Sequence, residues 1–195
     1  MANVYLAGVG GQGILLAAKV IADAAAAAGF DVAANEIHGM AQRGGSVTAQ
    51  IRYAPVVHSP LILEGTADVL GALEQIEALR CAHFLLPGGF AAVSKCSLVP
   101  VSVSSGAAVY PGDVESRLRR LFPRLCYYDC TAQALEMGDV RLANTMLVGI
   151  VAGALGDIPP EAWRQAIRGR VRAPLQEKNL AAFDFGRSLS NAALP

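Results

Sequence analysis

A glycine-rich turn near the amino terminus constrains the fold of this chain more than any other feature. A short apolar run, Val4 to Val9, leads into Gly8-Val9-Gly10-Gly11-Gln12-Gly13, and a segment rich in Leu, Ala and Ile follows as far as Ala28. An apolar run that ends at glycines is typical of a buried strand, and Gly29 is placed to end a helix. The pattern therefore predicts a strand, a tight turn and a helix.

A second predicted strand, Val32 to Ile37, completes a strand–helix–strand unit, whose connection is right-handed in nearly all known proteins. Similar elements follow, with a turn at Leu85 to Gly89 and an ambiguous stretch from Cys96 to Ala108. The further predicted strands are Val47 to Tyr53, Ala67 to Leu73, Phe90 to Ser94 and Leu125 to Asp129. The further predicted helices are Gln75 to Ala82, Gly112 to Leu121, Asn144 to Leu155, one that begins at Pro159-Pro160-Glu161, and Leu175 to Leu189.

This order of elements indicates the α/β class. We expect a single Rossmann-like domain over residues 1–195, with a mainly parallel sheet flanked by helices. Hydrophobic residues make up 53% of the chain and charged residues only 16%. A chain this apolar contains a largely buried parallel sheet or hides extra surface against a partner, and we expect both.

Composition also argues against several classes of function. The most apolar stretch, Ile14 to Phe30, is interrupted by Lys19 and Asp23, so no run of about 18 uncharged apolar residues suggests a membrane helix. The start of the sequence lacks the basic region of a secretory signal, and we expect a cytoplasmic protein. The 16 basic and 16 acidic residues balance, which argues against nucleic acid as the main partner.

Four cysteines, Cys81, Cys96, Cys126 and Cys130, have spacings that fit neither a tetrahedral zinc site nor an iron–sulfur cluster. Reduced, structural cysteines are the favoured interpretation, and they agree with a cytoplasmic location. We therefore predict no metal site in this chain.

The glycine turn itself is a candidate binding site. Gly8 permits the tight turn, Gly10 lets the backbone approach a ligand, and Gly13 lets the helix pack closely on the strand. The helix that follows offers free N–H groups and a partial positive charge, which suit a phosphate. Glu36 lies near the spacing at which dinucleotide-binding proteins place an acid on the ribose. A turn whose glycines only shape the backbone remains the alternative.

A second candidate site is the segment Glu36-Ile37-His38-Gly39-Met40-Ala41-Gln42-Arg43-Gly44-Gly45-Ser46-Val47. Arg43 is able to clamp a carboxylate or phosphate with two parallel hydrogen bonds, to cross a subunit boundary, or simply to lie in solvent. His38 has no evident carboxylate partner, so a structural or interface role is favoured over acid–base chemistry. Asn144, on the apolar helix, is interpreted as a satisfied core or interface amide.

These two segments together closely resemble the 2-oxoacid:ferredoxin oxidoreductase family, in particular the β subunit of its indolepyruvate type and, more broadly, the γ domain of the pyruvate and 2-oxoglutarate types. The resemblance spans almost the whole length and is weakest from Cys81 to Cys130. Further matching segments are Ser59 to Ile62, Ala67 to Leu70, Ala143 to Gly149 and Lys178 to Gly186.

The resemblance implies a heteromeric enzyme that decarboxylates aryl-2-oxoacids oxidatively with coenzyme A as co-substrate and passes electrons to ferredoxin. A larger α subunit would carry thiamine diphosphate, its magnesium ion and the [4Fe-4S] clusters, so this chain would bind no cofactor alone and hold no catalytic residue. Its expected contribution is architectural. The residues expected at the composite site or interface are Gly8, Gly10, Gly11, Gln12 and Gly13, with phosphate or coenzyme A as a possible ligand, and Met40, Gln42, Arg43 and Gly44.

Two other functions remain open on the sequence. The first is an independent NAD-dependent oxidoreductase with Glu36 on the ribose, although no Ser-Tyr-Lys or His-Asp set for hydride transfer is evident. The second is a non-catalytic scaffold module. Within the favoured interpretation, indolepyruvate, phenylpyruvate and hydroxyphenylpyruvate are equally acceptable substrates.

Overall fold

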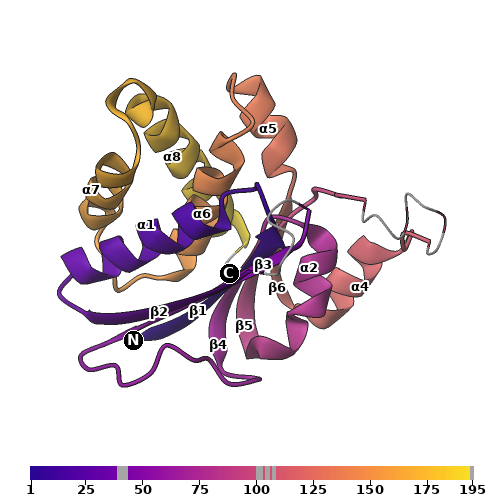
Figure 1. The fold of residues 1–195 in the computed structure, drawn as a ribbon, viewed down its shortest axis with the longest axis horizontal. Coiled ribbons are helices and arrows are strands. Elements are labelled where there is room, and N and C mark those ends of the chain that lie inside the picture. The colour runs from indigo at the N-terminus through magenta and orange to yellow at the C-terminus, as the bar shows by residue number, and fades with distance from the viewer. Residues whose placement is uncertain (39–43, 100–102, 104–105, 107–108, 194–195) are drawn as a thin grey trace.

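The computed structural model describes residues 1–38, 44–99, 103, 106 and 109–193. Its centre is a six-stranded sheet in the order β2-β3-β1-β4-β5-β6, with helices packed on both faces (Figure 1). The strands are β1 (Ala2–Val9), β2 (Asp31–His38), β3 (Ser46–Ala54), β4 (Ala67–Ala72), β5 (Leu85–Ser94) and β6 (Arg124–Tyr128). The predicted α/β class is confirmed.

The sheet is mixed. The pairs β1–β4, β4–β5 and β5–β6 are parallel, as expected, whereas β3 pairs antiparallel with both β1 and β2. β1 and β2 therefore run in the same direction but are not neighbours, because β3 lies between them. The predicted strand–helix–strand unit exists, with a third strand inserted into it.

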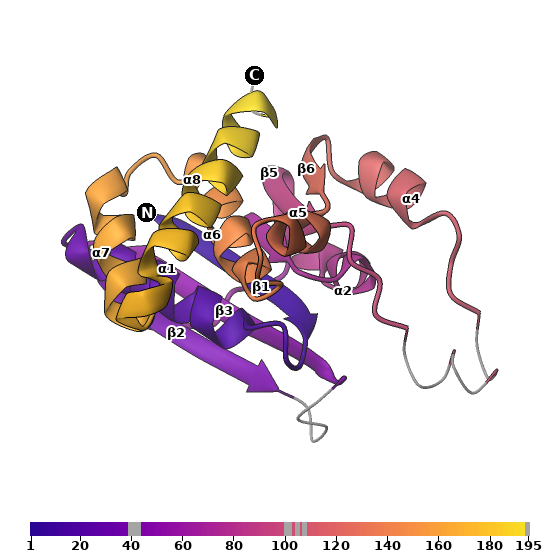
Figure 2. The same cartoon turned by 90° about the horizontal axis from the view of Figure 1, so that it is seen from above.

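Side chains of β1 alternate between two apolar cores, as the pleat of a strand requires. Val4 and Leu6 face the core that contains α1 (Ile14–Ala27) and α6 (Leu142–Ala154). Tyr5 and Ala7 face the core on the other side of the sheet, which α2 (Gln75–Arg80) and α4 (Val114–Leu121) cover. The first face also carries α5 (Cys130–Glu136), α7 (Pro160–Arg170) and α8 (Gln176–Ala193), as Figure 2 shows from above. Two short 3₁₀ helices are η1 (Ala82–Phe84) and η2 (Ala173–Leu175).

Two local predictions are wrong. The expected turn at Leu85 to Gly89 is part of β5, where the register against β4 shifts between the pairs Ala67–Leu85 and Val69–Phe90. Gly88 there has a positive φ of 81°, so the glycines mark an irregularity within a strand. The other error is α5, which the sequence analysis missed. It begins directly after β6, where Asp129 caps it by accepting a hydrogen bond from Ala132 N.

The predicted all-round apolar helix is confirmed as α6, nearly all of whose residues are buried. It packs very closely on α8. A Cβ added to Gly149 would lie 2.1 Å from Phe183 O, and one added to Gly186 would lie 2.0 Å from Met146 O. Glycine at both positions therefore lets the two backbones touch.

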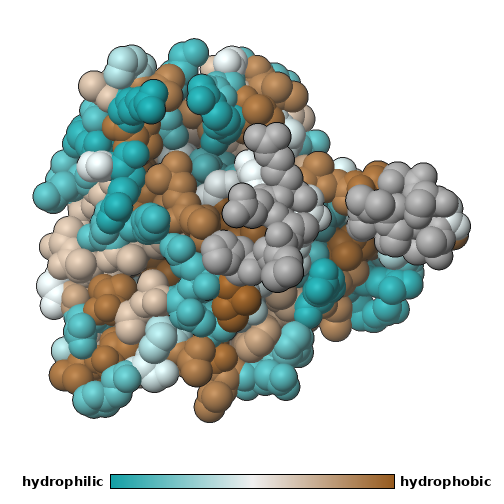
Figure 3. Space-filling view, viewed as in Figure 1, coloured by the Kyte–Doolittle hydropathy of each residue, from teal (hydrophilic) through white to brown (hydrophobic). Residues whose placement is uncertain are grey.

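Some apolar side chains remain exposed. The face in Figure 3 carries hydrophobic surface along its lower part, over the strands and the loop between β3 and β4. Val56, Leu61 and Leu63 in that loop are more than half exposed, and Ile37 near the end of β2 is half exposed. In the described part of the chain, no helix has the length and hydrophobicity needed to cross a membrane.

Candidate functional site

The glycine turn lies at the carboxyl ends of β1 and β4, two neighbouring parallel strands. The helices that follow these strands, α1 and α2, cover opposite faces of the sheet. Open α/β sheets bind ligands at this kind of switch point, because the diverging connections leave a crevice there. A cavity of about 610 Å³ opens at this place, and Gly11, Gln12 and Gly13 form part of its wall.

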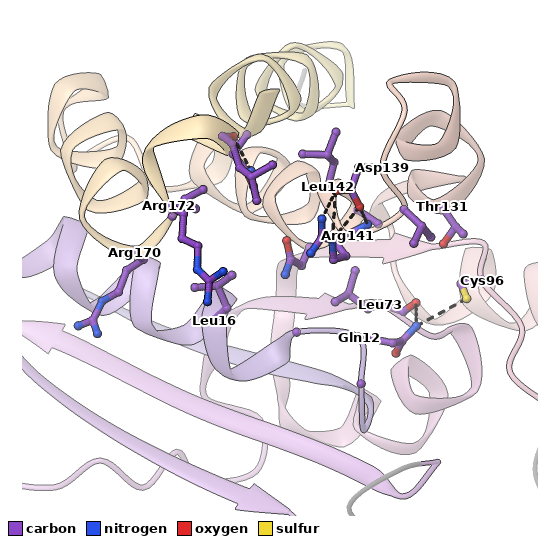
Figure 4. Close-up of a pocket in the computed structure, with 18 of the residues that line it drawn as sticks. Gln12, Leu16, Leu73, Cys96, Thr131, Asp139, Arg141, Leu142, Arg170 and Arg172 are labelled. Carbon is purple, nitrogen blue, oxygen red and sulfur yellow. Dashed lines mark hydrogen bonds and ion pairs between the residues drawn. The ribbon is translucent and has the colours of Figure 1, made fainter. Parts of the chain in front are cut away.

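Gln12 holds the ends of three strands together. Its Oε1 accepts a hydrogen bond from Val9 N at 2.8 Å, and its Nε2 donates to Leu73 O at 2.9 Å and lies 3.6 Å from Cys96 Sγ (Figure 4). Leu73 follows β4 and Cys96 follows β5. Gln12 thus lines the cavity, but its amide is engaged within the protein and fixes the shape of the turn.

The amino terminus of α1 is open toward a ligand. Gly13 caps the helix with a φ of 86°, and no side chain caps it. The backbone hydrogen bonds of α1 start with Ala17 N donating to Gly13 O. Within the described residues, the N–H groups of Gly13 and of the first helical turn, 14–16, have no acceptor. Such groups, together with the helix dipole, make a ready binding site for a phosphate or carboxylate.

Arginines line the opposite wall of the cavity. Arg141 pairs with Asp139 at 2.6 Å, and this guanidinium lowers the pKa of Asp139 to about 2. Arg170 pairs with Asp23 on α1. Arg172 makes no ion pair with any described residue, and Figure 4 shows it reaching from the segment before η2 toward Leu16 in the first turn of α1. It is therefore the cation best placed to meet an anionic ligand.

Asn144 lines the same cavity and is buried, in agreement with its interpretation as a core or interface amide, but only one end of the amide has a partner. It lies in the first turn of α6 with 7% of its surface exposed, and its Oδ1 accepts a hydrogen bond from Thr145 Oγ1 at 3.0 Å. Its Nδ2 has no acceptor among the described residues. Nδ2 faces the cap of α1, because a Cβ added to Gly13 would lie 2.2 Å from it. Sequence reasoning also missed Arg172, since no local pattern links residues so far apart to the glycine turn.

Thiol chemistry is not favoured at this site. All four cysteines are free, and Cys96, half-buried in the cavity wall, is the only one of them that lines it. Burial raises the pKa of Cys96 above that of an ordinary thiol. The group is therefore protonated at neutral pH and a weak nucleophile. Among the described residues, no three His, Cys, Asp or Glu side chains lie close enough to hold a metal ion.

The second predicted segment is only partly described. Met40, Gln42 and Arg43 lie outside the described residues. Gly44 and Gly45 meet the glycine turn directly, because Gly10 N donates to Gly45 O at 2.8 Å and Gly44 N to Gly10 O at 3.5 Å. The two glycine segments therefore share one edge of the sheet, as expected for two strands that run in the same direction.

Glu36 is poorly placed for a ribose. It lies on β2 opposite Ala49 of β3, which in turn lies opposite Leu6 of β1. Neighbouring strands are about 4.8 Å apart, so Glu36 is about 10 Å across the sheet from the strand that leads into the glycine turn. In the dinucleotide-binding fold the two strands are neighbours, and the inserted β3 removes that arrangement.

Comparison with known proteins gives a consistent result. The family model described as pyruvate ferredoxin/flavodoxin oxidoreductase matches residues 3–189. The indolepyruvate oxidoreductase subunit IorB of Archaeoglobus fulgidus is 37% identical, and the match covers 99% of this chain and 97% of that protein. The keto/oxoacid ferredoxin oxidoreductase γ subunit of Geobacter sulfurreducens has a similar fold, with a TM-score of 0.74 at 22% identity and 98% and 99% of the two chains covered.

A larger enzyme contains the same fold as one of its parts. The 2-oxoglutarate:ferredoxin oxidoreductase of Magnetococcus marinus, solved with 2-oxoglutarate, coenzyme A and succinyl-CoA bound, matches 98% of this chain with 31% of its own length. The TM-score is 0.71 and the sequence identity 22%.

Proposed function

This chain belongs to the pyruvate ferredoxin/flavodoxin oxidoreductase family, and from that premise we propose that it is the small subunit of a 2-oxoacid:ferredoxin oxidoreductase of the indolepyruvate type. In this proposal it works in a complex with a larger subunit. Thiamine diphosphate, magnesium and [4Fe-4S] clusters on that subunit supply the decarboxylation and the electron transfer. The small subunit completes the site at which coenzyme A is bound.

The observation that carries the proposal is the open amino terminus of α1 in a cavity that also holds Arg172. Coenzyme A has a diphosphate and a 3′-phosphate for such groups to bind. The same cavity has apolar walls, including Leu16, Leu98 and Val171, against which an uncharged pantetheine arm would pack. Its volume of about 610 Å³ is within the range of cavities that hold ligands of this kind.

The assignment of a partner rests on a different feature. The apolar side chains of Val56, Leu61 and Leu63 are left in solvent by the described part of the chain. Three exposed apolar side chains within one loop are the kind of surface that a partner protein covers. In this proposal coenzyme A must reach the thiamine diphosphate on another protein. A larger subunit is therefore the partner that the proposal requires.

The proposal is tested by tagging this chain in its native context and isolating its complex without oxygen. We expect a brown partner protein and reduction of a viologen dye that depends on both an aryl-2-oxoacid and coenzyme A. Turnover of a 2-oxoacid by the lone chain, or tight binding of NADH measured by fluorescence, would contradict the proposal.

Arg172→Ala is expected to raise the KM for coenzyme A about tenfold or more in that complex, because charge-assisted hydrogen bonds contribute about 1.5–3 kcal/mol each. The KM for the 2-oxoacid should not change. Arg164→Ala is the control, since Arg164 pairs with Asp184 on the adjacent helix and does not line the cavity. An equal rise in both KM values would show that Arg172 stabilises the subunit and binds no ligand.

A further inference from the structure

Asn144 carries a donor that the protein itself does not use. The side chain is more than nine-tenths buried and lines the cavity at the start of α6. Its Nδ2 has no acceptor within the described residues. Nδ2 is not one of the fully enclosed side-chain atoms that lack a partner in the described part of the chain, so a group that enters the cavity is able to reach it and is its natural acceptor.

The orientation of this amide is set by neighbouring polar groups. Thr145 Oγ1 lies between two carbonyl oxygens, 3.0 Å from Asn144 Oδ1 and 2.7 Å from Asn179 Oδ1, and shares its one hydrogen with them. Asn179 is held in turn by its Nδ2, which donates to Leu175 O at 2.8 Å. Since Oδ1 of Asn144 is directed at Thr145, Nδ2 is directed away from it, toward the cap of α1.

The position of Nδ2 also explains why residue 13 is glycine. A side chain there would begin 2.2 Å from Nδ2 and would push it out of place. With glycine, the amide lies directly beside the residue that caps α1. Two independent parts of the chain, the amino termini of α1 and α6, therefore bring donors to the same cavity.

We infer that Asn144 binds the ligand through Nδ2 and that the group it binds is the diphosphate of coenzyme A. This inference rests on the proposed function for the identity of the ligand. A diphosphate fits because it offers several acceptor oxygens and carries the negative charge that the amino terminus of α1 favours. A thiol or an adenine ring offers no comparable charge.

Asn144→Asp is the most informative variant. The carboxylate has the shape of the amide, lies in the first turn of α6 and faces the amino terminus of α1, two places where a negative charge stabilises a helix. The variant is therefore expected to fold. It replaces the donor with a charge of the same sign as the diphosphate.

The experiment is calorimetric titration of the full-length chain with coenzyme A, inorganic diphosphate and pantetheine. We expect Asn144→Asp to weaken the binding of coenzyme A and of diphosphate about tenfold or more, and to leave pantetheine binding unchanged. Asn144→Ala should act in the same direction and serves if the aspartate variant does not fold. Asn3→Asp is the control. It adds the same charge near the start of β1, at the end of the strand away from the glycine turn, and should not change the binding of coenzyme A, diphosphate or pantetheine.

The results separate this inference from the proposed function. Equal binding of coenzyme A and diphosphate by the wild-type protein and both Asn144 variants would overturn the inference and leave the proposed function intact. An equal loss of pantetheine binding would also overturn it, because a general distortion of the cavity would then be the cause. A wild-type chain that binds diphosphate in an Asn144-dependent way but does not bind coenzyme A would support the anion contact and contradict the proposed ligand.

Discussion

Gly13 meets two requirements that no other residue type meets together. Its φ of 86° is strained for any side chain, and its missing Cβ leaves room for Asn144. Gly11, two residues earlier, has a φ of 104° but no neighbouring atom within 4 Å of an added Cβ. The two glycines therefore separate the backbone requirement from the packing requirement.

Gly11→Ala is expected to lower the free energy of unfolding by about 1 kcal/mol through backbone strain alone. Gly13→Ala should lower it by about 2–4 kcal/mol, because the collision with Asn144 is added to the strain. Urea unfolding of both variants and the wild-type chain measures the difference. Equal losses would mean that Asn144 moves aside without cost.

At the scale of single residues, the sequence predicts those site residues that lie close together in the chain. Gly10 and Gly13 are recognisable because the strand before them and the helix after them are adjacent in the chain. Asn144 and Arg172 join the same site only through packing between α1, α6 and the segment before η2, and each looks ordinary in its own segment. Only the fold shows that they face the glycine turn.

Among the elements, the contact between α6 and α8 depends on glycine more than any other. Gly149 and Gly186 each lie against a backbone oxygen of the opposite helix, and backbone atoms do not move aside as the end of a side chain does. Gly153, one turn further along α6, lies against the side chain of Ser190, whose Cβ would be 2.3 Å from an added Cβ. The stripe of glycines fixes the distance between the helices.

Gly149→Ala is expected to destabilise the protein by about 3 kcal/mol, because α6 and α8 must separate to admit the methyl group. Gly169→Ala in α7 is the matched control. An added Cβ meets nothing there within 4 Å, so alanine should stabilise the chain by up to about 1 kcal/mol through its higher helix propensity. Thermal unfolding of both variants tests the pair, and a Gly149→Ala protein as stable as the wild type would refute the close contact.

The elements themselves follow well from local patterns, whereas their pairing does not. Each strand predicted up to Tyr53 is present, yet the position of β3 between β1 and β2 depends on hydrogen bonds between distant segments. The same applies to Leu85 to Gly89, where a glycine pair that usually marks a turn falls in an irregularity between two residues paired with β4 and stays within the strand. Local propensity identifies a break in regular backbone but not whether the chain reverses there.

Across the whole molecule, buried thiols occupy both apolar cores. Cys81 lies in the core under α2, and Cys126 and Cys130 lie in the core under α6. Burial raises the pKa of Cys81 and Cys126 to about 11 and that of Cys130 to about 12. In the unfolded chain these thiols ionise at an ordinary pKa near 8.5.

The folded state therefore holds more protons than the unfolded state in alkaline solution. The contribution of these thiols to stability should be fully present below about pH 8.5 and should be lost progressively as the pH rises toward 11–12. The urea midpoint at a series of pH values from 7 to 11 measures this loss. Cys81→Ala should reduce the slope, and a midpoint that stays constant above pH 9 would contradict the burial of the thiols.

The tight packing of α6 on α8 also determines when the apolar core is able to form during synthesis. Met146 and Ile150 on α6 cover the sheet, and Phe183 on α8 is fully buried in the same core. A ribosome that has made β1 to β6 has still to make both helices, so the part of this apolar face that α6 and α8 cover stays open until α8 has been made. Products that stop before α8 should bind chaperones or be degraded, and a reporter fused after α8 should therefore mark molecules whose core has formed.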